Sequence, residues 1–149
     1  MSDSDILGVN KRPQGTFDAQ LELKPSGELA VTTAGTKILD VGTGLFKGKL
    51  LLDVASIESN SDGNFVIFVQ GSTDKAFATN KTVDLAEISI GAGGTKRSIA
   101  RVTDTAGRYK LYFDNERNGT YYPYLRIYTC VLASTNKKIN YSAYVVPME

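Results

Sequence analysis

"YYPYLRIYTCVL", residues 121–132, decides the fold class of this chain. Its tyrosines and β-branched residues favour a strand, and side chains along a strand point alternately to its two faces. One face of this strand carries Leu125, Ile127, Thr129 and Val131. The opposite face carries Tyr124, Arg126, Tyr128 and Cys130. A strand in a small domain usually has one polar face towards water, so the second face here predicts contact with another layer or another molecule.

The same period of two runs along most of the chain, and no window sustains the helical i, i+3, i+4, i+7 pattern. The strands expected from this period are Gln20–Leu23, Glu28–Thr33, Lys37–Val41, Lys49–Ser56, Phe65–Gln70, Val83–Ile90, Lys96–Val102, Arg108–Asn115, Tyr122–Leu132 and Ile139–Val146. Gly-rich turn signals, among them Pro25-Ser26-Gly27, separate them. The segment most compatible with a short helix is Asp74–Thr79. The sequence therefore predicts an all-β fold, an antiparallel β-sandwich that is jelly-roll-like and has about 8 to 10 strands.

Two stretches are the expected anchors of the core. In residues 49–57, Leu50, Leu52 and Val54 should face inward while Asp53 faces out. Residues 65–69 are apolar on both faces. The connection between the two stretches contains Asp-Gly at positions 62 and 63, which is typical of a hairpin turn.

The first residues differ from the rest, because they show no sustained alternation and contain Pro13 and Gly15. We therefore expect an extended N-terminal arm over residues 1–19 and a single β-sandwich domain over residues 20–149. Such an arm is either frayed or ordered on a partner. In the second case its candidate anchors are Ile6, Leu7, Val9 and Phe17.

Composition narrows the function classes. The chain has 149 residues, a formal net charge of +1, no histidine and one cysteine, Cys130. Without histidine the common Ser-His-Asp and Cys-His pairs cannot form, and a structural zinc site lacks ligands. The balanced charge gives no field that favours nucleic acid or an anionic membrane. We expect no catalytic residues, no metal and no cofactor, and a protein made in a reducing cytosol, since neither a membrane span nor a signal peptide is visible.

Three motifs bear on possible chemistry. The stretch 42–49, GTGLFKGK, resembles a phosphate loop, but Thr43 stands where the first glycine belongs and Leu50 stands where Ser or Thr should bind magnesium. It is better explained as a Gly-punctuated turn with solvated lysines. The loop 91–97 ends in two basic residues without interleaved aromatics, so a solvated loop is preferred to a nucleic-acid site. Carboxylates such as Asp84 and Asp114 lie near strand ends, and nothing places two of them together.

Tyrosine is unevenly distributed, because all eight tyrosines fall between Tyr109 and Tyr144. Tyrosine offers a rigid surface with a polar tip, which suits protein–protein contacts. For Tyr109, Tyr112 and Tyr141 we expect a place in or at the edge of the core. The candidate protein interface is formed by Tyr121, Tyr122, Tyr124, Arg126 and Tyr128, with a place in the core as the open alternative for the tyrosines.

The stretches 39–44 (LDVGTG), 48–54 (GKLLLDV), 68–74 (FVQGSTD), and 107–109 (GRY) running through to 124–128 (YLRIY) resemble one known family. That family is the small β-sandwich cement or decoration proteins, also called minor capsid proteins, of tailed bacteriophages. The resemblance extends from about residue 21 to 146. It implies a jelly-roll-like sandwich that binds outside a capsid at junctions between major capsid proteins and stabilises the shell.

The resemblance also implies the partners: the major capsid protein, and the chain itself as a dimer or trimer, with no nucleic acid and no membrane. The location would be the capsid exterior of the virion, after synthesis in the host cytoplasm. The arm would then be a candidate strap over a neighbouring subunit. The alternative is a carbohydrate- or receptor-binding β-sandwich, since jelly rolls also serve as lectins. The absence of tryptophan and of a calcium-type carboxylate cluster weighs against it.

Overall fold

The computed structural model describes residues 21–58, 64–91, 105–132 and 138–148. Within them it contains strands and one three-residue 3-10 helix, η2 (Thr79–Lys81). The strands are β1 (Glu22–Leu29), β2 (Thr33–Ala34), β3 (Leu39–Asp40), β4 (Lys47–Ile57), β5 (Asn64–Ser72), β6 (Thr82–Gly91), β7 (Gly107–Asp114), β8 (Glu116–Arg117), β9 (Thr120–Tyr121), β10 (Tyr124–Val131) and β11 (Ile139–Met148). The expected arm and the expected strand Lys96–Val102 lie outside the described residues.

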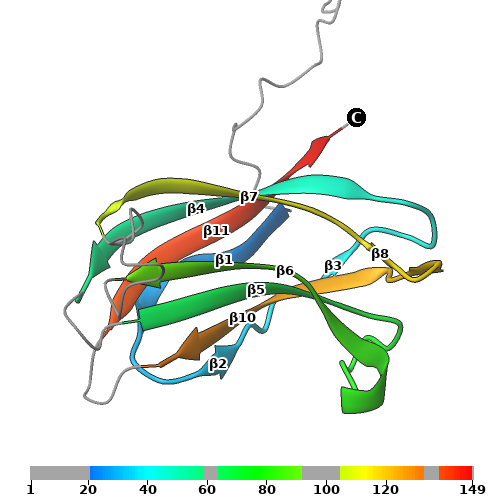
Figure 1. Cartoon of the computed structure of the whole chain (residues 1–149), viewed down its shortest axis with the longest axis horizontal. Coiled ribbons are helices and arrows are strands. Elements are labelled where there is room, and N and C mark those ends of the chain that lie inside the picture. Colours follow the sequence, from blue (N-terminus) through cyan, green and yellow to red (C-terminus); the bar gives the residue numbers. More distant parts are fainter. Residues whose placement is uncertain (1–20, 59–63, 92–104, 133–137, 149) are drawn as a thin grey trace, which may run out of the picture.

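The strands form two facing sheets and a small hairpin. Sheet A has the order β1-β11-β4-β7, and sheet B has the order β2-β10-β5-β6, with β3 also pairing β10. In Figure 1, sheet A lies above sheet B. Numbered along the chain, the eight strands of these two paths have the orders 1-8-3-6 and 2-7-4-5, which is a jelly roll. All pairs are antiparallel. The predicted all-β, antiparallel, jelly-roll-like sandwich is confirmed. The hairpin predicted between residues 49–57 and 65–69 was wrong, because β4 lies in sheet A and β5 lies in sheet B.

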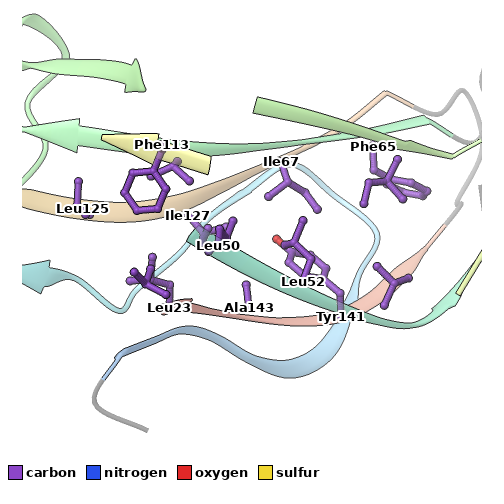
Figure 2. Close-up of a cluster of buried hydrophobic side chains, with 14 of the residues drawn as sticks. Leu23, Leu50, Leu52, Phe65, Ile67, Phe113, Leu125, Ile127, Tyr141 and Ala143 are labelled. Atoms are coloured by element: carbon purple, nitrogen blue, oxygen red, sulfur yellow. The ribbon is translucent and has the colours of Figure 1, made fainter. Parts of the chain in front are cut away.

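The core lies between the sheets and consists of the inward side chains of both (Figure 2). The inward prediction for β4 is confirmed, because Leu50, Leu52 and Val54 are buried while Asp53 is half-buried on the other face. The other large side chains that are fully buried here include Leu23, Phe65, Ile67, Leu125, Ile127 and Tyr141. Alternation at period two on both sheets is what brings these apolar residues to one interior.

Tyr141 carries the one hydroxyl among the largest core side chains named above, and it bonds the buried hydroxyl of Thr129 across the sandwich. Burial raises the pKa of this phenol above its usual value of 10.0. The expected core position of Tyr141 is therefore confirmed. Tyr109 also packs against the core, but the same prediction was wrong for Tyr112, which is 59% exposed on the outer side of β7.

A predicted turn at Pro25-Ser26-Gly27 was wrong, because β1 runs through it as an irregular edge strand. The register against β11 shifts between Glu22 and Lys24 and again between Lys24 and Gly27. The Lys24 ammonium donates to the carbonyl oxygens of Tyr141 (2.6 Å), Gly27 (2.9 Å) and Pro25 (3.1 Å), which holds the irregular strand in place. Proline is tolerated here because the bulged strand is at the sheet edge.

The interpretation of residues 42–49 needs a correction at its second half. Lys47 to Lys49 already belong to β4, and Lys49 is only 6% exposed, so it is not a solvated turn lysine. The turn itself is fixed by the fully buried Asn115. Its side chain accepts from the Phe46 backbone N–H (2.7 Å) and donates to the carbonyls of Gly44 and Tyr122.

Candidate functional site: the outer face of sheet B

The outward side chains of β10 and β5 form a continuous surface on the side of sheet B away from the core. We call it the β10 face, and its members are Phe68, Gln70, Tyr124, Arg126, Tyr128 and Cys130. The two strands pair over eight residues without a register shift, which places Tyr128 opposite Phe68 and Arg126 opposite Gln70. Because β10 lies inside the sheet with β5 on one side and β2 and β3 on the other, the face is carried by a central, well-supported strand.

The structure brings three of the five candidate interface residues together. Tyr124, Arg126 and Tyr128 are all half-buried on the β10 face, while Leu125 and Ile127 between them are buried in the core. Tyr121 lies apart in β9 and is 44% exposed. Tyr122 packs against the core instead, so of the two interpretations left open for it the core position holds. The interface role of the remaining residues stays a prediction.

Arg126 is the centre of a polar network on this face. Its Nε donates to Gln70 Oε1 (2.9 Å), and Gln70 Nε2 donates in turn to Asp84 Oδ1 on β6 (3.0 Å). The guanidinium carbon lies 4.3 Å from the centroid of the Phe77 ring, which is a close cation–π geometry. The arginine is thus fixed in orientation from two sides, which lowers the conformational entropy that a binding event would have to remove.

Phe77 belongs to this site, although sequence reasoning did not identify it. The segment Asp74–Thr79, named above as the one most compatible with a short helix, is a turn, and η2 begins only at Thr79. Asp74 organises the turn, because its carboxylate accepts from the backbone N–H groups of Ala76 (3.1 Å) and Ala78 (3.3 Å). Phe77 is held at φ 56, a conformation that bulky residues rarely adopt. In the sequence, the signal that could have identified Phe77 is that it is a single aromatic residue within a polar, turn-like stretch.

The rest of the face combines aromatic surface with carboxylates at its edge. The Phe68 and Tyr128 rings lie 6.3 Å apart at a tilt of 56°. Asp84 and Glu87 are exposed on the neighbouring edge strand β6, where Glu87 pairs with Phe68. Such a surface can stack, hydrogen-bond and present fixed charges, all of which serve recognition.

Apart from the β10 face, a hollow lies at the open edge of the sandwich, between β1 and β2. Its volume is about 260 Å³, and it is lined mainly by β1 residues and by Thr33 to Thr36, with Ile127 and Thr129 at its floor. Burial lowers the pKa of Lys24 beside it. The three ammonium hydrogens of Lys24 match the three carbonyl oxygens already described, so this cation serves the irregular strand.

Within the described ranges, no group of three or more His, Cys, Asp or Glu side chains is positioned to hold a metal ion. In the same ranges, no helix is long and apolar enough to cross a membrane. No family model matches the chain, and no curated protein matches it.

Proposed function

We propose that this chain is a non-enzymatic structural virion protein that binds the outer surface of a phage capsid and stabilises the shell. The observation that carries the binding role is the β10 face, where Tyr124, Arg126 and Tyr128 lie side by side in an ordered arrangement. Tyrosine and arginine are enriched among the residues that dominate protein–protein binding energy. The resemblance of the strand and turn stretches to decoration proteins supplies the capsid as the partner.

The shape of the face favours a protein partner. Two neighbouring strands of a sheet present side chains at fixed spacing, so little ordering is needed on binding. A shell offers many identical sites, and modest single contacts then add through multivalency when the protein is a dimer or trimer. The jelly roll occurs in viral capsid proteins and in lectins alike, so the fold is compatible with this role without deciding it.

Capsids that lack the protein provide the direct test. Purified protein mixed with expanded capsids should co-sediment at a fixed ratio to the major capsid protein. Tyr128→Ala and Arg126→Ala should each weaken retention by about tenfold or more, the size of effect seen for central interface residues. Tyr112→Ala is the matched control, because Tyr112 is an exposed tyrosine on the other sheet and should retain wild-type binding.

Two outcomes would overturn the proposal. The first is no binding to capsids at any stage of maturation. The second is binding that Tyr128→Ala and Tyr112→Ala reduce equally, which would remove the β10 face from the contact. A glycan array probed with the same proteins separates the alternative class: Tyr128-dependent binding to defined sugars, with no capsid binding, would make the chain a carbohydrate-binding module.

A further inference from the structure

The end of the Arg126 side chain carries hydrogen-bond donors that the fold does not use. A guanidinium group has five N–H donors and no acceptor. In Arg126 the Nε–H is donated to Gln70, and the group lies against the Phe77 ring. Among the described residues, neither of the terminal nitrogens Nη1 and Nη2 has a hydrogen-bond acceptor. The two contacts thus fix the direction of the guanidinium and leave its terminal NH2 groups for a bound group.

The positive charge of Arg126 is not balanced by direct contact either. The ion pairs between described residues do not include it. Arg126, Gln70 and Asp84 stand opposite one another in a row across β10, β5 and β6. The neutral amide of Gln70 lies between the other two, so Asp84 orients the amide without pairing with the arginine. A half-buried cation without an anion favours the binding of an anion.

The neighbouring side chains on the same strand supply further donors. Tyr124 and Tyr128 stand two residues before and after Arg126, about 7 Å away along the strand and on the same face. In the described part of the chain neither phenol hydroxyl has a hydrogen-bond partner. Donors therefore gather around one point of the β10 face. A carboxylate only accepts hydrogen bonds, and its two oxygens match two parallel N–H groups of a guanidinium.

The charges around this point favour a carboxylate over a phosphate. Asp84 and Glu87 on β6 are exposed, and Asp40 on β3 is exposed opposite Tyr124. These three carboxylates repel a phosphate, which carries nearly two negative charges at neutral pH. The single charge of a carboxylate is balanced by the one guanidinium, with less repulsion from the edge of the face.

We propose that the terminal NH2 groups of Arg126 bind the carboxylate of an Asp or Glu side chain on the protein partner, with the hydroxyls of Tyr124 and Tyr128 as flanking donors. The inference rests on the proposed capsid contact, and it names the chemical group that this contact requires on the major capsid protein. Gln70 and Phe77 are positioning residues, because they hold the guanidinium in one orientation before the partner arrives.

Moving one negative charge within the row tests the proposal from the side of this chain. The double variant Gln70→Glu with Asp84→Asn keeps the net charge but places a carboxylate beside Arg126, which then pairs within its own chain. Capsid binding should fall about tenfold or more, while the thermal unfolding midpoint is kept because the row stays hydrogen-bonded. Asp84→Asn alone is the matched variant, and it should bind about twofold more tightly because it removes a repelling charge.

A second experiment changes the partner instead. Treating empty expanded capsids with a carbodiimide and glycinamide converts their accessible carboxylates into neutral amides. The unchanged protein should bind treated capsids about tenfold or more weakly than untreated ones. Arg126→Gln lacks the guanidinium, so it should bind both kinds of capsid equally weakly. This equality also shows that the treatment leaves the rest of the capsid surface intact.

The possible failures can be told apart. If the unchanged protein binds untreated capsids, and the double variant or the treated capsids bind just as tightly, the carboxylate inference is overturned and the proposed function stands. No binding of the unchanged protein to untreated capsids overturns both. Binding to acidic sugars on a glycan array that Arg126→Gln abolishes, without capsid binding, would show that the carboxylate belongs to a carbohydrate and would overturn the protein partner.

Discussion

The two outer faces of the sandwich arise from the same alternation of strand residues, yet they meet their surroundings differently. On sheet B the β10 face is aromatic and half-buried, and its arginine is bound to Gln70 and stacked on Phe77. On the outer face of sheet A, the three residues that we call the Leu51 patch, Leu51, Tyr144 and Val146, are only 2%, 3% and 8% exposed, and Lys49 beside Val146 is 6% exposed. A face that is sealed contributes to the stability of the fold, whereas a face that stays half open and ordered is suited to a partner.

The largest expected effect is a difference in the loss of stability between a substitution on the outer face of sheet A and one on the β10 face. Leu51→Ala should lower the free energy of unfolding by about 2–5 kcal/mol, because it removes a buried side chain and leaves a cavity. Phe68→Ala on the β10 face should cost about 1 kcal/mol, because that ring is already partly in water. Denaturant titrations of both variants measure the difference. Equal losses would show that the two faces are covered to the same degree.

Tyr141, in the core between the two faces, should make the free energy of unfolding depend on pH. The pKa of Tyr141 is raised in the folded state, so above pH 10 the unfolded chain loses this proton while the folded chain keeps it. Stability from this group is present below about pH 10 and should fall by about 1.4 kcal/mol per pH unit above it. Denaturant titrations between pH 9 and 11 measure the slope. The Tyr141→Phe variant should lack this contribution to the slope of unfolding free energy against pH. A slope equal to that of the unchanged protein would contradict the raised pKa of Tyr141.

Phe77, whose ring stacks on Arg126 at the β10 face, has a constrained backbone conformation that can be tested by substitution. At φ 56 glycine is accommodated without strain and alanine is not. Both Phe77→Gly and Phe77→Ala lose the ring over Arg126, but the glycine variant should be about 1 kcal/mol more stable than the alanine variant. This reverses the usual order of the two residues. Thermal or denaturant unfolding of the pair decides it, and the ordinary order would mean that the positive φ is not maintained.

The smallest expected effect concerns the rim of the Leu51 patch. The Arg108 and Asp53 side chains are 49% and 40% exposed, so Arg108→Ala should cost only about 0.5 kcal/mol. The loss should shrink further in high salt, because exposed ion pairs are screened. Arg126→Ala, which removes a half-buried and stacked guanidinium, should cost more and depend less on salt. A larger loss of stability for Arg108→Ala than for Arg126→Ala would mean that the arginine on sheet A contributes more to stability than the one on the β10 face.

Much of the fold could be predicted because alternation acts locally. The inward set of β4, the two-faced character of β10 and the sandwich class all follow from which residues alternate. The irregular β1 could not be predicted, because its support is the Lys24 contact with the Tyr141 carbonyl, 117 positions away. The turn around Phe77 has a different, local cause. Asp74 offers the backbone a local alternative to the helix, and side-chain capping of this kind competes with helical hydrogen bonds.

The candidate site divides in the same way. The sequence alone determined that Tyr124, Arg126 and Tyr128 share one face, because residues two apart on a strand must do so. It also determined that the chain lacks histidine and offers a single cysteine. Only the tertiary structure decided that Tyr122 turns inward, that Phe77 stacks on Arg126, and that Leu51, Tyr144 and Val146 are sealed. Alternation fixes the direction of a side chain, but what lies over it depends on segments distant in the chain.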